Sequence, residues 1–163
     1  MKPVLVLALG NALAGDDGVA CEVAARLERE PGLAGAIDVH CAGTDLLHAA
    51  PLIRGRRRLI IIDATLTADD RPAVDVVPHG ALEAQRTGGA HSLDPVAALQ
   101  LLRALDGDIA SVDAYWILVG VSSIRLGRGL SAAADALVPE VIASVAALSR
   151  LTAPTVQGVS SDA

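Results

Sequence analysis

Two neighbouring carboxylates follow the first apolar segment of the chain. Asp16 and Asp17 come after residues Val4–Leu9, separated from them by the loop Gly10–Gly15. That loop has the glycine-to-glycine span of a phosphate-binding loop, but acids occupy the positions where such a loop carries lysine and serine or threonine. In an α/β protein, ligand sites are usually built in loops that follow strand ends. The pattern therefore predicts a site for a cation rather than for a phosphate.

Two more polar residues lie next to predicted strands or helices, where a ligand site could form. Asp63 ends the apolar run Leu59–Ile62, and His91 lies in a glycine-containing loop before a predicted helix. If the third strand pairs with the first on the side opposite the second, Asp17 and Asp63 can reach one ion, because neighbouring strands are about 4.8 Å apart. Imidazole with carboxylates suits a first-row divalent ion such as nickel or zinc. We expect Asp17, Asp63 and His91 to be both metal ligands and catalytic residues.

Each of these residues also has a simpler interpretation. One of Asp16 and Asp17 could cap a helix, and Asp63 could cap a turn. His91 alone would be an ordinary loop histidine, or it could form a nucleophilic dyad with Cys41, although nothing in the local sequence indicates a lowered thiol pKa. HExxH, CxxC and GxSxG motifs are absent from the sequence. The combination of the three residues, rather than any one of them, favours the metal site.

Alternating strands and helices are expected to position these residues. Five short apolar segments are typical of buried strands: Val4–Leu9, Ile37–Cys41, Arg58–Asp63, Val74–Val77 and Tyr115–Val121. Helical periodicity appears between them at about 19–27, 46–53, 95–105 and 130–148, the third beginning with an Asp94-Pro95 cap. This order predicts a single-domain, three-layer α/β fold, with a mostly parallel twisted sheet of about five strands and helices on both faces. We expect residues 1–150 to form that domain and 151–163 to be a flexible tail.

Composition and charge exclude several classes of partner. The 163 residues are 52% hydrophobic with one Trp, one Tyr and no Phe, so Ala, Val, Leu and Ile must form the core. A net charge of −6 disfavours binding to nucleic acid and to anionic membranes. No stretch approaches the roughly 18 apolar residues that a membrane span needs. The basic run Arg54–Arg58 is interpreted as a solvated connection or, alternatively, as a docking patch for an acidic partner.

The two cysteines and the amino-terminal residues indicate in which cellular compartment the protein is located. Cys21 and Cys41 have no CxxC spacing, which favours reduced thiols in a cytoplasmic protein. Lys2 and the apolar run Val4–Leu9 imitate a signal peptide, but the run has only six residues and fits a first buried strand equally well. We therefore expect a cytoplasmic location.

The order of several short motifs resembles a known family. These motifs are the stretch from Val4 to Val19, then Ala42–Thr44, Ile60–Ala64, His91–Leu93 and Leu118–Val121. Together they resemble the hydrogenase maturation endopeptidases over nearly the whole chain up to about Ser149. One departure is Ala20, where many members of that family have glycine.

The resemblance implies an activity and a substrate. The family removes the C-terminal extension of the nickel-iron hydrogenase large-subunit precursor after nickel insertion, and by position its metal-binding residues look like Asp17, Asp63 and His91. Nickel would then be carried by the substrate, with another divalent metal possible in vitro, and the enzyme would act as a monomer. Whether nickel acts as a Lewis acid, or one of the two aspartates acts as a general base, is left open by the sequence. Alternatives are a related peptidase for another precursor, and a non-catalytic nickel chaperone or small-ligand-binding domain on the same scaffold.

Overall fold

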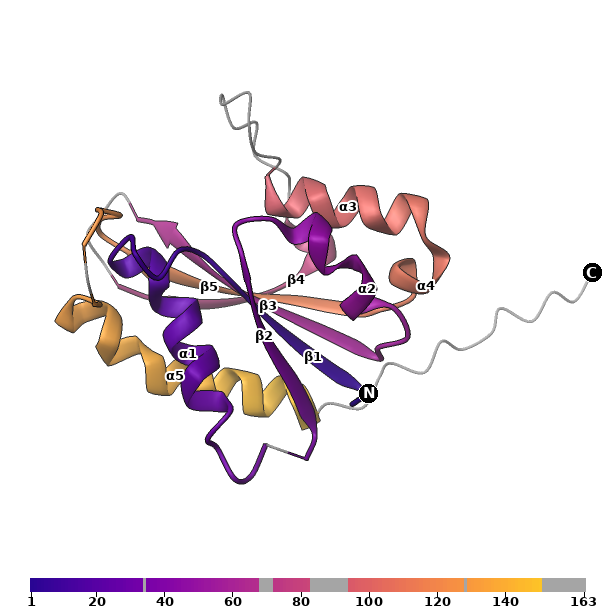
Figure 1. The fold of residues 1–163 in the computed structure, drawn as a ribbon, viewed down its shortest axis with the longest axis horizontal. Coiled ribbons are helices and arrows are strands. Elements are labelled where there is room, and N and C mark those ends of the chain that lie inside the picture. Colours follow the sequence, from indigo (N-terminus) through magenta and orange to yellow (C-terminus); the bar gives the residue numbers. More distant parts are fainter. Residues whose placement is uncertain (34, 68–71, 83–93, 128, 151–163) are drawn as a thin grey trace, which may run out of the picture.

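A twisted five-stranded sheet lies at the centre of the molecule in the computed structural model, which describes residues 1–33, 35–67, 72–82, 94–127 and 129–150 (Figure 1). Its strands are β1 (Val4–Leu9), β2 (Ile37–Gly43), β3 (Arg58–Leu66), β4 (Val74–Pro78) and β5 (Asp113–Val121). Their order is β2-β1-β3-β5-β4, and only β4 is antiparallel to its neighbour. The expected pairing of the third strand with the first, opposite the second, is confirmed.

Side chains of β1 alternate between two hydrophobic cores, one on each face of the sheet. Val4, Val6 and Ala8 face one core, and the intervening leucines face the other. Such burial on both faces explains why the strand is a continuous apolar run rather than an alternating one.

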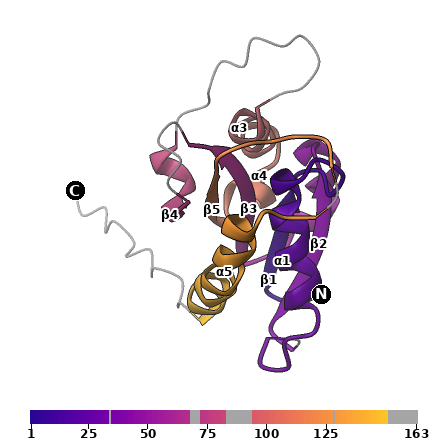
Figure 2. The ribbon, with the colours of Figure 1, turned by 90° about the vertical axis from the view of Figure 1, so that its left-hand side faces the viewer.

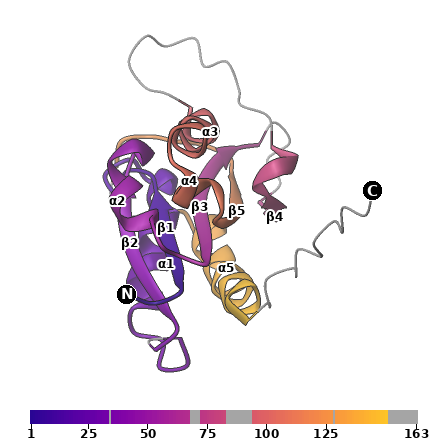
Figure 3. The same cartoon turned by 90° about the vertical axis from the view of Figure 1, so that its right-hand side faces the viewer.

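Helices cover both faces (Figures 2 and 3). The first core lies under α1 (Val19–Leu27) and α5 (Ala132–Arg150), and the second under α2 (Ala50–Ile53), α3 (Pro95–Leu105) and α4 (Gly107–Ala110). Three short 3-10 helices complete the described part: Asp16–Gly18, Leu46–Ala49 and His79–Ala81. The predicted three-layer α/β class is confirmed, although α4 had no counterpart in the sequence pattern. The expected tail, 151–163, lies outside the described residues.

Helix α5 continues through Pro139 and is apolar enough, by length and composition, to cross a membrane. The expectation that no stretch of the chain is long and apolar enough for a membrane span is therefore wrong for this helix. In the fold, however, the helix buries Ala134, Val138, Val141 and Val145 in the core that it shares with α1 and the sheet. Its apolar character is therefore accounted for by packing in a globular domain.

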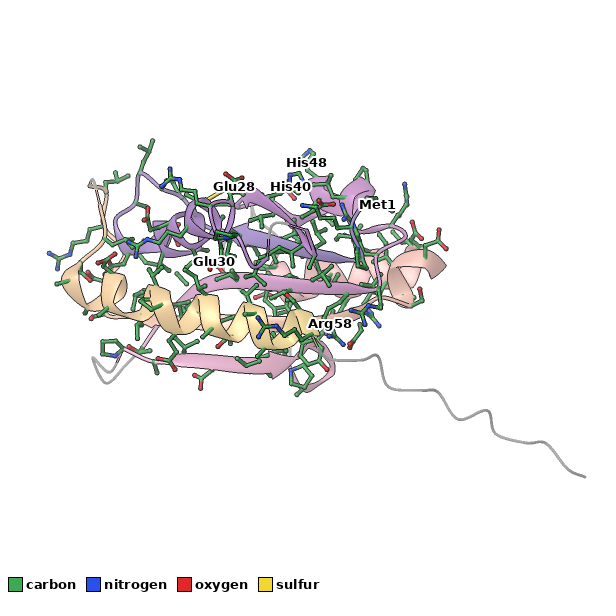
Figure 4. All side chains as sticks on the ribbon, turned by 90° about the horizontal axis from the view of Figure 1, so that it is seen from below. Met1, Glu28, Glu30, His40, His48 and Arg58 are labelled. Carbon is green, nitrogen blue, oxygen red and sulfur yellow. A yellow bond between two sulfur atoms is a disulfide. The ribbon has the colours of Figure 1, made fainter. Side chains whose placement is uncertain are left out.

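Two arginines of the basic run, Arg56 and Arg58, are buried and serve the fold. Arg58 has a side chain only 1% exposed, donates to Asp113 Oδ2 from Nε (3.0 Å) and Nη2 (2.5 Å), and bonds the carbonyl of Leu148. Figure 4 shows Arg58 beside the C-terminal end of α5. Arg56 is also buried and pairs with Asp38. Both sequence interpretations of these two arginines, a solvated connection and a docking patch, are therefore wrong.

The two cysteines form a disulfide between α1 and β2. The Cα atoms of Cys21 and Cys41 are 5.7 Å apart, so the prediction of reduced thiols is wrong for this structure. The spacing of 20 residues gave no sign of the pairing, which depends on α1 packing against the edge strand β2. Because Cys41 is bonded to Cys21, it is not the free nucleophile that a dyad with His91 requires.

Candidate active site

The loop between β1 and α1 holds Asp17 in a defined position. Gly10 has a φ of 128°, and a side chain there would overlap the carbonyl oxygen of Asp17, so glycine is required at this close approach. Asp17 Oδ2 in turn accepts a 2.7 Å hydrogen bond from the amide of Asn11. The carboxylate is thus anchored at the carboxyl end of β1 by its own loop.

Asp16 has a different role from its neighbour. It is 7% exposed and accepts hydrogen bonds from Ser131 N (2.6 Å) and Ser131 Oγ (2.8 Å), while that same hydroxyl accepts from the amide of Ala134 in α5. The expectation that Asp16 or Asp17 caps a helix is wrong, because α1 begins after Gly18 without a side-chain cap. Asp16 instead ties the loop to the start of the last helix.

Asp63 lies within β3, opposite Leu118 of β5 in the register. The strand continues to Leu66, so the alternative in which Asp63 caps a turn is wrong. Burial, followed by the negative charges of Asp17 and Asp94, raises the pKa of Asp63 to about 7, and a hydrogen bond from the amide of Ala64 opposes that rise. Near neutral pH this carboxyl is poised between its acid and its anion.

A small cavity of about 160 Å³ opens beside Asp63. Asp94, Leu82, Trp116 and Leu118 contribute to its wall. Asp94 is the predicted cap of α3, and its Oδ1 accepts from Val96 N (2.9 Å) and Ala97 N (3.1 Å). Asp94 was predicted only as a cap, but it also lies beside Asp63, and its place three residues after His91 was a usable signal.

Trp116, in the cavity wall, forms an ordered pair with His79. Trp116 Nε1 donates to His79 Nδ1 at 3.1 Å, and the two rings stack with centroids 6.2 Å apart. Burial lowers the pKa of His79, which keeps this nitrogen an acceptor. The indole beside Asp63 is therefore held in one orientation.

Of the three predicted ligands, the structure describes two on elements that lie in contact. The 3-10 helix that carries Asp17 contacts β3, and the negative charge of Asp17 helps to raise the pKa of Asp63, whereas His91 lies outside the described residues. Within the described ranges, no three His, Cys, Asp or Glu side chains gather closely enough to hold a metal ion by themselves. The chemistry of the pair still fits a cation, because two repelling carboxylates gain from any positive charge placed between them.

The fold matches that of several solved proteins. A [NiFe] hydrogenase maturation protease, HybD from Thermococcus kodakarensis, superposes with a TM-score of 0.71 at 27% identity, over 92% of this chain and 100% of that one. HybD from E. coli, a hydrogenase maturating endopeptidase, gives 0.69 at 22% identity over 91% of each chain. HycI from Thermococcus kodakarensis gives 0.70 at 15% identity over 92% of this chain and 94% of that one.

The chain therefore has the fold of the nickel-iron hydrogenase maturation proteases, and the resemblance seen in the sequence is confirmed. No model of a protein family matches the chain, and no curated protein matches it either.

Proposed function

We propose that this protein is an endopeptidase that removes the C-terminal extension of a nickel-iron hydrogenase large-subunit precursor after nickel insertion. The observation that carries the proposal is the acidic pair of Asp17 and Asp63 at the carboxyl edge of a sheet shared with maturation proteases. Ligand sites of open α/β sheets form at this edge, where the strand order changes direction. Here that change lies between the adjacent strands β1 and β3.

Nickel is part of the substrate in this proposal. Asp17, Asp63 and His91 complete the coordination of an ion already held by the precursor, which places the scissile peptide beside these residues. When bound, the ion can polarise a peptide carbonyl. The pKa of Asp63 is near 7, and its carboxyl binds a metal ion only as the anion. A precursor that carries nickel offers this anion a positive charge, whereas an empty precursor does not, so the site favours the loaded one.

Exposed apolar side chains next to the site fit a protein substrate. Leu13, in the loop that carries Asp17, is 68% exposed, and Leu126 is 89% exposed. The two segments are joined by a 3.1 Å hydrogen bond from Gly127 N to Leu13 O. We expect the precursor to cover these leucines, and we expect the enzyme to work as a monomer in the cytoplasm.

The test mixes the purified protein with nickel-loaded and nickel-free precursor and weighs the products by mass spectrometry. Loss of a short C-terminal peptide from the loaded sample alone supports the proposal. Cleavage of both samples would refute the nickel trigger, and cleavage of neither would refute the activity.

Calorimetry on the isolated protein separates the non-catalytic alternative. A nickel chaperone has to bind nickel tightly by itself, whereas an enzyme that meets nickel on its substrate needs only a weak, open site. Submicromolar nickel binding without any precursor cleavage would favour the chaperone.

A further inference from the structure

The disulfide is connected to both ends of the loop that carries Asp17. Cys41 pairs with Ala8 in the register of β2 and β1, and two residues later the carbonyl of Gly43 accepts a 2.9 Å hydrogen bond from Gly10 N. Cys41 is thus joined, through a short rigid path, to the residue that begins the loop.

The other half of the disulfide is joined to the end of the same loop. Cys21 is in the first turn of α1, directly after the 3-10 helix Asp16–Gly18. A side chain at Gly10 would overlap the backbone of Asp17, so the two ends of the loop are in contact. The disulfide, the Gly10–Gly43 hydrogen bond and this contact together close a ring that includes Asp17.

Solvent can reach both cysteines. Cys41 is exposed on the edge strand, and Cys21 is half-buried and lines a cavity of about 610 Å³ between α1 and the segment leading into α5. A small thiol or disulfide therefore has a path to the bond without unfolding of the domain.

We propose that Cys21 and Cys41 form a reversible thiol–disulfide site that sets the rigidity of residues 10–18. The oxidant is a low-molecular-weight disulfide of the glutathione class. The Cys41 thiolate attacks one sulfur of that disulfide, forming a mixed disulfide and releasing one small thiol. The Cys21 thiolate then attacks Cys41 Sγ and releases the second, so two protons and two electrons leave the protein.

The oxidised form holds the loop in the conformation that aims Asp17, and the reduced form loosens it. A crosslink lowers the freedom of the segment that it closes, and an active site gains when its groups are held in place before the substrate arrives. The effect on catalysis rests on the proposed function, whereas the effect on loop rigidity does not.

Hydrogen exchange tests the structural part. The wild-type protein is equilibrated with glutathione disulfide or with a reducing dithiol, and amide exchange is followed by mass spectrometry. Oxidised protein should be lighter by two hydrogen atoms, and residues 10–18 should exchange about tenfold more slowly than in the reduced form. The strand segment Ile60–Ile62 serves as an internal reference that should not change.

Cys41→Ser and Cys21→Ser are the matched variants, because each keeps the side-chain size and removes the bond. Both should exchange at the reduced rate under either condition. Two alkylatable thiols in the glutathione-disulfide sample, or equal exchange of residues 10–18 in both redox states, would overturn the proposal.

A parallel precursor assay keeps the two proposals distinguishable. Reduction should lower kcat/KM several-fold without abolishing cleavage, and the serine variants should be insensitive to the redox condition. If neither redox form cleaves while the exchange difference is present, the proposed function fails and the redox site stands.

Discussion

Charged side chains are paired at the end of the sheet where β1, β2 and β3 begin (the amino edge) but not at the end where these strands finish (the carboxyl edge). At the amino edge, Arg56 hydrogen-bonds Asp38 and lowers the pKa of that carboxyl to about 2. At the carboxyl edge, Asp63 faces the negative charges of Asp17 and Asp94, and its pKa rises to about 7. Within the described ranges, no arginine or lysine pairs with Asp63.

This difference indicates that the charges at the amino edge stabilise the fold, whereas those at the carboxyl edge are available to a ligand. Paired charges at the amino edge satisfy one another, so they leave nothing for a partner to bind. Acids that pair with no arginine or lysine of the described part of the chain cost stability, and such a cost is typical of groups that are kept for binding or catalysis.

The largest effect should follow loss of the candidate ligands. Asp17→Ala, Asp63→Ala and His91→Ala should each reduce cleavage of a nickel-loaded precursor by at least about 100-fold, because each removes a proposed ligand. Melting curves and circular dichroism should show an intact fold. Asp75→Ala, which removes an exposed acid of β4, is the control and should cleave normally. Cleavage at the normal rate by His91→Ala would remove that residue from the ligand set.

At the amino edge, Arg58→Met should lower the free energy of unfolding by about 3–5 kcal/mol, because Asp113 loses its buried partner. The matched variant is Arg54→Met, whose side chain is 56% exposed and pairs with Asp106, and it should cost less than about 1 kcal/mol. Urea unfolding measures both. Equal losses would show that burial does not distinguish the two arginines.

The pH dependence of stability should reveal the cost of ionising Asp63 at the carboxyl edge. Because the pKa of Asp63 is raised from 3.8 to about 7, the fold favours its protonated form. That contribution is fully present below about pH 4 and is lost as the pH rises through 7. Asp63→Asn removes the ionisation, so at pH 8 the variant should be more stable than the wild type by up to about 4 kcal/mol, although inactive.

The advantage of Asp63→Asn should shrink toward zero at pH 4. Denaturant titrations of both proteins across this range provide the measurement. A constant difference between pH 4 and pH 8 would mean that the carboxyl is not held in its acid form.

The smallest effect separates the two adjacent acids. Asp16→Asn keeps one acceptor for Ser131 and loses the charge, so we expect a loss of about 1–2 kcal/mol in stability and nearly normal cleavage. Paired melting and cleavage assays decide the matter. A variant that melts normally but cleaves poorly would exchange the roles assigned to Asp16 and Asp17.

Local patterns predicted the fold well where burial is continuous. The bounds of β1 were predicted correctly because all six residues are buried and apolar. Strand β3 was predicted to end at Asp63, yet pairing with β5 carries it on to Leu66. Its last residues lack a strand-like pattern, and only the register with a distant strand makes them one.

Features that depend on distant partners were not accessible from local patterns. The partner of Asp16 lies 115 residues away, and the partner of Cys21 lies on an edge strand. The burial of Arg58 requires β5 and the end of α5 to cover it. In contrast, Asp17 and Asp63 were predicted as a pair because strand order alone brings the carboxyl ends of β1 and β3 together.

The bond between Asp16 and Ser131 has a consequence for biosynthesis. A nascent chain that ends before residue 131 gives Asp16 neither of its two donors, so the loop lacks its tie to the last helix. Chains are made from the amino end, and domains generally fold as units. The proposed active site therefore stays unfinished on the ribosome until the last helix emerges, when almost the entire domain has been translated.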